Sequence, residues 1–175
     1  EIEDILVLKN NRGTDDNRVR KMDYSIQFCR LFYRRFVEDG YITLFSPHEV
    51  QDLYGWFGYN NDEFEKLYEQ YERSRSIWKK RIKARTFFNA FCKERIETGR
   101  MYVMNIDHCN DHSSFIDKIK MSNLCQEITL PTTPLNHIDD NCSTDAEIAL
   151  CVLSAINVGA IKLSELKDIC MNIVR

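Results

Sequence analysis

The chain has 175 residues, of which 43% are hydrophobic, so it can form one compact core and is too short for two domains of ordinary size. Its formal net charge is −3, which gives no electrostatic basis for direct binding to nucleic acid or to a membrane surface. It has no apolar run of 18 residues or more and no signal-peptide pattern, so we expect no membrane association.

Seven cysteines are irregularly spaced, and no two of them form a C-x-x-C pair. This pattern argues against a disulfide framework and indicates a reducing compartment, so we expect a cytoplasmic location. Most of the thiols should pack as small buried hydrophobic groups. The chain starts within an apparent helix and ends without a capping signal, which predicts an internal piece of a larger protein, cut at both ends.

Apolar spacing and turn residues predict long helices that alternate with short, apolar strands. Helices are expected over residues 1–9, 22–37, 48–58, 61–74, 79–98 and 164–175. Strands are expected over 41–45, 101–107, 122–130 and 147–153, with polar loops at 108–115 and 131–145. This alternation is typical of an α/β fold whose strands are buried on both faces.

The stretch SNLCQEITLPT, residues 122–132, places Asn123, Cys125 and Glu127 two residues apart within a predicted strand. Successive side chains of a strand point to opposite faces, so these three should point the same way. In one interpretation they form a site with a reactive thiol, a carboxylate base and an amide that holds the substrate by hydrogen bonds. In the other, they are polar residues of a half-buried strand.

The segment HCNDHSSF contains His108, Cys109 and His112, whose nitrogen and sulfur atoms could ligate a metal. Three candidates within five residues, without a second cluster, fall short of a structural zinc pattern, so we expect no metal here. The stretch NNRGTDDNR, residues 10–18, reads by itself as a connection between helices. The basic stretch 73–85 reads as a solvated helix face, because acidic residues precede it.

Several long motifs in one order resemble the large subunit of class I ribonucleotide reductase. These motifs are DILVLKNNRGTDDNRVRKMDY, YITLFSP, MYVMNIDHCNDHSSF, SNLCQEITLPT and EIALCVLSAINVGAI, and together they span essentially the whole chain. The resemblance implies a ten-stranded α/β barrel made of two five-stranded halves, with surrounding helices. The chain would then be an internal segment, residues 1–175, of this catalytic barrel domain.

The resemblance also implies a role for each residue of the SNLCQE motif. Cys125 would become a transient thiyl radical that takes the 3′ hydrogen atom of the ribose, and it is then expected to be buried without a partner histidine. Glu127 would accept the proton of the 3′-hydroxyl group, and Asn123 would hold the hydroxyl groups. Cys151 would be one of two cysteines that supply electrons while the 2′-hydroxyl group leaves as water. Cys142 competes with Cys151 for this last role, and the matching strand favours Cys151.

Residues 12–18 resemble the loop through which an effector nucleotide selects the substrate base, with Arg18 expected to reach the base or phosphate of the substrate. The loop comprises Arg12, Gly13, Thr14, Asp15, Asp16, Asn17 and Arg18. The implied partners are a ribonucleoside diphosphate, a second large subunit and a small subunit that contains a metal and generates the radical. Thioredoxin or glutaredoxin would serve as reductant, and ATP and deoxynucleoside triphosphates as effectors. No cofactor is expected to bind this segment, and the segment alone should have no activity.

Two other classes of function remain open at this point. In a cysteine-nucleophile enzyme, His108 or His112 would activate Cys125 or Cys109, and one thiol would react rapidly near neutral pH. In a non-catalytic helical interaction module, all of the thiols would only pack.

Overall fold

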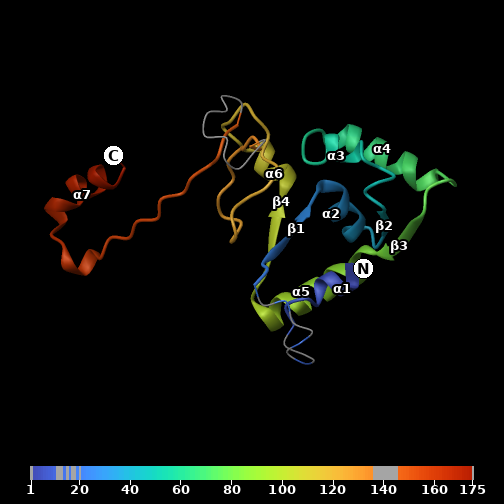
Figure 1. The fold of residues 1–175 in the computed structure, drawn as a ribbon, viewed down its shortest axis with the longest axis horizontal. Helices are drawn as coiled ribbons and strands as arrows, with labels where there is room; N and C mark the ends of the chain where they lie inside the picture. Colours follow the sequence, from blue (N-terminus) through green and yellow to red (C-terminus); the bar gives the residue numbers. More distant parts are fainter. Residues whose placement is uncertain are drawn as a thin grey trace. The chain divides into compact units, whose positions relative to one another are not determined.

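The computed structural model describes residues 2–10, 14, 16, 19, 21–135 and 146–174. They form two units, residues 1–132 and 133–175, which are described separately. The helices and strands of the first unit are α1 (Ile2–Leu6), β1 (Tyr24–Phe28), α2 (Arg30–Val37), β2 (Tyr41–Phe45), α3 (Leu53–Trp56), α4 (Asn61–Arg73), β3 (Lys79–Lys83), α5 (Ala84–Thr98), β4 (Met101–Asn105) and α6 (Ile106–Asp111) (Figure 1). None of the described helices is both long and apolar enough to span a membrane.

Strands β1 and β4 pair in parallel, with Tyr24 opposite Met101 and Phe28 opposite Asn105. Strand β4 was predicted from the sequence, whereas residues 24–28 were predicted as part of a helix, which is wrong. Their apolar residues fit a period of two as well as a helical period, and the partner strand that decides between them lies more than 70 residues further along the chain. Tertiary pairing therefore overrides the local pattern.

Strands β2 and β3 pair antiparallel, with Tyr41 opposite Lys83. The prediction of β2 is confirmed, but residues 79–83 form a strand where a helix was expected, and α5 begins only at Ala84. The long basic side chains of KKRIK favour a helix locally. In the sheet they find a specific partner, because Arg81 and Lys83 lie 4.8 and 4.6 Å from the centroid of the Tyr41 ring.

Helix α4 begins at Asn61 and α5 ends at Thr98, as predicted. The Asn60 side chain accepts a hydrogen bond from the backbone N–H of Glu63 at 3.2 Å, which satisfies a free donor in the first turn of α4. Helix α5 ends at Gly99, whose φ of +66° is the left-handed conformation that glycine adopts most readily. The structured helix α3 covers only four residues of the longer one predicted.

Helix α6 covers the last two residues of the predicted strand 101–107 and the start of the predicted polar loop 108–115. The Asn110 side chain explains this difference, because its amide nitrogen donates to the carbonyl of Ile119 at 3.0 Å and its oxygen accepts from the Ile119 N–H at 2.8 Å. This pair of bonds ties the end of α6 to a segment that follows nine residues later. Such a side-chain contact leaves no periodic signal in the sequence.

An aromatic cluster forms the centre of the first unit, where α2 and α5 pack against β1. Phe28 stacks on Phe32 at 4.2 Å and meets the edge of Phe91 at 5.7 Å, measured between ring centroids. Phe87 and Phe91 of α5 are buried in this cluster, whereas Ile96 of the same helix is 84% exposed. Aromatic pairs of this kind add to the free energy gained by burial.

A polar network connects α2, β2 and α4. The carboxylate of Glu72 accepts two hydrogen bonds from Arg35, at 2.7 and 2.6 Å, and one from the Thr43 hydroxyl at 2.6 Å. The phenol of Tyr68 donates to the carbonyl of Thr43 and accepts from its N–H. Burial raises the pKa of Tyr68 to about 12, so the phenol stays protonated and keeps both bonds.

We expect Glu72→Gln to weaken the stability of the first unit at neutral pH and to flatten its dependence on acid. Burial opposes ionisation of Glu72, but the hydrogen bonds from Arg35 and Thr43 prevail and lower the pKa of its carboxyl group. Because the folded pKa lies below the unfolded value of about 4.3, this stabilisation is complete above that pH and is lost as the pH falls through the folded pKa.

The expected loss at pH 7 is about 1.5 to 3 kcal/mol, the usual contribution of hydrogen bonds to a charged group. Urea titrations at a series of acid pH values would measure it. Glu69→Gln is the matched control, since Glu69 lies in the same helix but is 39% exposed and forms ion pairs that solvent screens. Equal acid dependence in wild type and Glu72→Gln would contradict the prediction.

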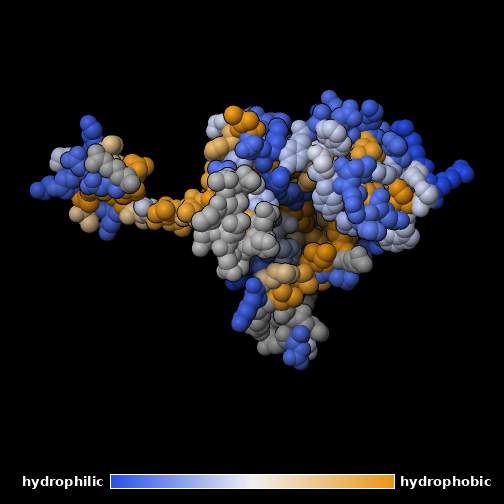
Figure 2. Space-filling model, turned by 45° about the horizontal axis from the view of Figure 1, so that its top comes forward, coloured by the Kyte–Doolittle hydropathy of each residue, from blue (hydrophilic) through white to orange (hydrophobic). Residues whose placement is uncertain are grey.

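The second unit contains η2 (Val158–Ala160), η3 (Leu163–Glu165) and α7 (Leu166–Ile173). Its predicted terminal helix is present, but the predicted buried strand 147–153 is not. Within the described residues this segment pairs only at Glu147, which exchanges two backbone hydrogen bonds of 3.0 Å with Thr133. Figure 2 shows hydrophobic residues along the extended segment before α7, and Leu150, Val152 and Leu153 are all more than 80% exposed.

The described residues therefore form a mixed α/β structure, as the alternation of elements predicts. They contain two two-stranded sheets and no closed barrel. Met101 and Met104 point to opposite faces of β4 and are 0% and 2% exposed, so burial on both faces is confirmed for this strand. Strand β3, in contrast, has exposed residues.

Candidate functional site

The SNLCQE segment is a closed turn and not the strand that the sequence predicts. The N–H of Gln126 donates to the carbonyl of Asn123 at 3.2 Å, which places Leu124 and Cys125 at the two corner positions. Gln126 has a φ of +66°, a conformation that no regular strand contains. The expectation that three side chains share one face of a strand is therefore wrong.

Asn123 holds this turn together through its side chain. Its amide oxygen accepts from the N–H of Ile128 at 3.0 Å and from the Ser122 hydroxyl at 3.1 Å. Asparagine side chains commonly compete with regular secondary structure by bonding to nearby backbone groups. The hydrogen bonds of the Asn123 side chain thus stabilise a turn, whereas the alternating polar pattern predicts a strand.

Cys125 and Glu127 are exposed, and Asn123 is half-buried. The expectation that Cys125 is buried is wrong for this chain. The thiol donates to the phenolic oxygen of Tyr102 in β4, with 3.9 Å between Sγ and Oη. On the same phenol, the Arg95 guanidinium lies 5.2 Å from the ring centroid. The turn thus presents a thiol to solvent beside a phenol of the parallel sheet.

The turn is anchored to the sheet from its N-terminal side. The Gln27 side chain in β1 donates to the carbonyl of Lys120 at 2.8 Å. Immediately before, Ile119 is 1% exposed and is bound on both its N–H and its carbonyl by Asn110 of α6. The position of Cys125 is therefore set by contacts with β1, β4 and α6.

The other predicted site residues are not brought into this site. Cys151 is exposed in the second unit and lies outside any helix or strand. Of the loop 12–18, Thr14 and Asp16 are described and exposed, and the remaining members lie outside the described residues, as does Cys142. Those undescribed members are Arg12, Gly13, Asp15, Asn17 and Arg18.

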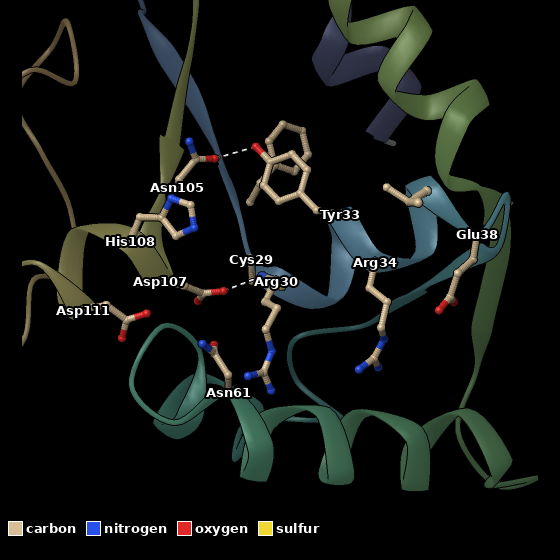
Figure 3. A pocket seen from close by; sticks show the side chains of 12 residues that line it. Cys29, Arg30, Tyr33, Arg34, Glu38, Asn61, Asn105, Asp107, His108 and Asp111 are labelled. Carbon is tan, nitrogen blue, oxygen red and sulfur yellow. Dashed lines mark hydrogen bonds between the residues drawn. The ribbon is translucent and has the colours of Figure 1, made fainter.

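A separate pocket of about 570 Å³ lies between α2, α6 and the start of α4, and it contains none of the predicted catalytic residues. Arg30 and Arg34 extend from α2 toward α4, where Glu65 accepts a hydrogen bond from each of them (Figure 3). Asp107 accepts from the backbone N–H of Arg30, and burial raises the pKa of its carboxyl group. The polar groups of this pocket are thus engaged in hydrogen bonds within the protein.

Sequence reasoning missed Cys29 and Asp107, which line this pocket. Burial raises the pKa of the Cys29 thiol to about 11, so the thiol is a packed group and not a nucleophile at neutral pH. An acidic residue at the end of the predicted strand 101–107 was the one available signal for Asp107.

The geometry argues against a cysteine nucleophile activated by histidine. The described hydrogen bond of Cys125 is to a tyrosine, and burial raises the pKa of Cys109. The rings of His108 and His112 lie 6.2 Å apart on α6 and its C-cap. Among the described residues, no group of three or more histidine, cysteine or acidic side chains is arranged to hold a metal ion.

Comparison with known proteins decides the family. The sequence profile described as "Ribonucleotide reductase, barrel domain" matches residues 1–174. This chain is a member of the ribonucleotide reductase barrel-domain family. It is 51% identical, over its whole length, to the ribonucleoside-diphosphate reductase subunit alpha of Buchnera aphidicola subsp. Acyrthosiphon pisum, and covers 23% of that protein.

Further relatives of this ribonucleotide reductase segment carry the same name. It is 52% identical over 78% of its length to ribonucleoside-diphosphate reductase 1 subunit alpha of Escherichia coli, of which it covers 18%. It is 48% identical over 89% of its length to the subunit alpha of bacteriophage T4, of which it covers 20%. The chain therefore spans about a fifth of the length of these relatives.

Proposed function

We propose that this chain is an internal segment of the large subunit of a ribonucleoside-diphosphate reductase, within a ten-stranded catalytic barrel. The observation that carries the proposal is the barrel-domain match over residues 1–174, which includes the whole SNLCQE turn. Relatives that match across this region are named ribonucleoside-diphosphate reductase subunit alpha. The substrate class follows from those names.

In the proposed reaction the thiyl radical of Cys125 takes the 3′ hydrogen atom of the ribose, which restores the thiol and leaves a radical on the sugar carbon. Glu127 accepts the proton of the 3′-hydroxyl group, and Asn123 holds the hydroxyl groups. The 2′-hydroxyl group takes up a proton and leaves as water, and C2′ gains a hydrogen. The thiols of Cys151 and a second cysteine outside this chain supply the two protons and two electrons for these changes and become a disulfide, and Glu127 returns its proton to the 3′ oxygen. The 3′ hydrogen then returns from Cys125 to the sugar, which regenerates the thiyl radical.

The turn suits the first of these steps in two ways. The Cys125 thiol is at the corner of a turn whose backbone is fixed by hydrogen bonds of Asn123 and Gln126. Glu127 is two residues away and, like Cys125, exposed, so both can reach one sugar placed over the turn. Holding a reactive atom in a fixed place is one of the largest contributions that a protein makes to catalysis.

The whole reaction requires parts beyond these residues. We propose a metal-containing small subunit as the source of the radical, thioredoxin or glutaredoxin as reductant of the disulfide, and a second large subunit that completes the effector site. ATP and deoxynucleoside triphosphates would act as effectors. The isolated segment of 175 residues is expected to form no deoxynucleotide.

The test is to assay the full-length large subunit with its small subunit, a dithiol reductant and each ribonucleoside diphosphate. Formation of the corresponding deoxynucleotide, dependent on both subunits, would support the proposal. A full-length subunit that binds nucleotides but yields no deoxynucleotide with an active small subunit would overturn it.

Arg18 should connect effector binding to substrate choice. A guanidinium group offers a planar set of donors to a base or phosphate. In the full-length enzyme, Arg18→Ala is expected to reduce the effector-dependent preference among substrates about tenfold or more. Competition assays with all four diphosphates under each effector would measure this. Preferences equal to those of wild type would contradict the role of Arg18.

A further inference from the structure

We propose that Tyr102 is a positioning residue for the reaction, and that its phenol fixes the direction in which the Cys125 thiol points. This inference rests on the proposed function of Cys125. The contact that carries it is the hydrogen bond between Cys125 Sγ and Tyr102 Oη, at 3.9 Å. A thiol is a weak hydrogen-bond donor, so a phenolic partner can restrict its orientation and still leave the thiol available for reaction.

The hydrogen bonds within the turn fix its backbone but not the cysteine side chain. Asn123, Ser122 and Gln126 bond to backbone atoms of the turn or to one another. A cysteine at an exposed corner keeps its rotation about the Cα–Cβ bond. The bond to Tyr102 restricts that rotation, and in this way a phenol on β4 can select one orientation of the reactive sulfur.

Tyr102 is itself held from two sides. Its backbone is paired in register with Ser25 of β1, inside the parallel ladder. The Arg95 guanidinium lies 5.2 Å from the centroid of its ring and also donates to the carbonyl of Gly99 at 2.6 Å, at the end of α5. A cation tied to a helix end and placed over an aromatic face restricts the ring. The phenol is therefore a fixed point against which the thiol can be oriented.

The electrostatics of Tyr102 agree with this contact. The pKa of its phenol is raised, first by the hydrogen bond with Cys125, then by the electrostatic interaction with the same residue, and to a smaller extent by desolvation, while Arg95 lowers it. A raised pKa corresponds to the phenol donating to the sulfur, which is the reverse sense of the same contact. The phenol thus keeps its proton beside the sulfur through the neutral range. The proposed role involves no transfer of an electron or hydrogen atom to Tyr102.

The first test compares Tyr102→Phe with Tyr41→Phe in the full-length enzyme with its small subunit. Phenylalanine keeps the ring over which Arg95 lies and removes the hydroxyl group that meets the thiol. We expect kcat to fall about 10- to 100-fold with little change in KM, because a misplaced reactive atom affects the chemical step more than substrate binding. Tyr41 is the matched control, since cations also flank its ring but it lies in the other sheet, and its variant should keep wild-type kcat.

The second test reads the contact directly and does not depend on turnover. A fluorotyrosine at position 102 is titrated by fluorine NMR in the full-length subunit, with Cys125 present and in Cys125→Ala. We expect the pKa of the phenol to be lower in Cys125→Ala, because the hydrogen bond and the electrostatic interaction with Cys125 that raise it are both removed. This measurement also applies if Tyr102→Phe does not fold.

The outcomes separate this inference from the proposed function. An active wild type, an unchanged kcat in Tyr102→Phe and identical phenol titrations would overturn the positioning role while leaving the reductase activity intact. A folded wild type without reductase activity would instead overturn the proposed function, and with it the role of Tyr102. A lower kcat together with a titration that shifts in Cys125→Ala would support the inference.

Discussion

Replacing Cys125 with serine in the full-length subunit is expected to abolish deoxynucleotide formation, with a loss of at least about 1,000-fold, or about 4 kcal/mol in activation free energy. Serine has nearly the same size and hydrogen-bonding groups, so the turn closed by Asn123 should survive. Its O–H bond is much stronger than an S–H bond, and the radical that abstracts the 3′ hydrogen atom would not form. The substitution therefore removes the chemistry and keeps the geometry.

Cys170→Ser is the matched control, because Cys170 is also exposed but belongs to α7 of the second unit. It should retain wild-type turnover. Nucleotide binding, followed by equilibrium dialysis, should be equal in both variants, which separates a loss of chemistry from a loss of substrate binding. Substantial turnover by Cys125→Ser would show that the turn has a structural role, and the assignments of Asn123 and Glu127 would fall with it.

The parts of the fold that the sequence predicts best are those determined by neighbouring residues. Helix α4 has its capping asparagine at position 60, α5 has a glycine at its end, and β2 is a short aromatic and β-branched run closed by Pro47. These signals act within one turn of a helix or one strand, so a single sequence contains all of them.

The failures have a common physical cause, which is a partner remote in the chain. Residues 24–28 and 79–83 become strands because β4 and β2 pair with them. Helix α6 depends on the side-chain bonds between Asn110 and Ile119. Burial of 147–153 was expected from its apolar composition, yet within the described residues its pairing is limited to Glu147. Local periodicity cannot reveal such pairings.

The motifs point to Asn123, Cys125 and Glu127 as candidate site residues, and their roles stay predictions. The family assignment agrees with the resemblance that those motifs carry, whereas the strand predicted for them is wrong. The alternating pattern N-x-C-x-E was interpreted as a strand, whereas the Asn123 side chain and the positive φ of Gln126 close it into a turn. Tyr102 had no signal, because it was one aromatic residue of a predicted strand.

Gly58→Ala is expected to destabilise the first unit by about 2 to 4 kcal/mol. Gly58 has a φ of +73°, and a Cβ atom there would collide with Cγ1 of Ile106, whose side chain is 1% exposed. The left-handed conformation costs an alanine about 1 kcal/mol, and forcing extra volume into a packed core costs about 1 to 3 kcal/mol more. Ile106 begins α6 directly after β4, so the strain falls on the strand that carries Tyr102.

Two other glycines of the chain separate these two costs. Gly99 has a φ of +66°, and no atom lies within 4 Å of an added Cβ. Gly99→Ala should therefore lower the free energy of unfolding by only about 1 kcal/mol. Gly55→Ala has open space within α3 and no positive φ, so it should be neutral or stabilising by up to about 1 kcal/mol. Local unfolding free energies from hydrogen exchange over α3, α5 and α6 would measure all three variants in the full-length subunit.

If Gly58→Ala and Gly99→Ala lower the free energy of unfolding equally, the close approach of Gly58 to Ile106 does not affect stability, and α6 is not held by it. If Gly58→Ala loses more and also lowers kcat, the packing of α6 transmits its strain through β4 to Tyr102 and the Cys125 thiol. Adding Ile106→Ala would then distinguish strain from other effects, because it removes both γ-carbons from the collision. It should restore part of the stability lost by Gly58→Ala, although the same substitution alone would destabilise the core by about 2 to 5 kcal/mol.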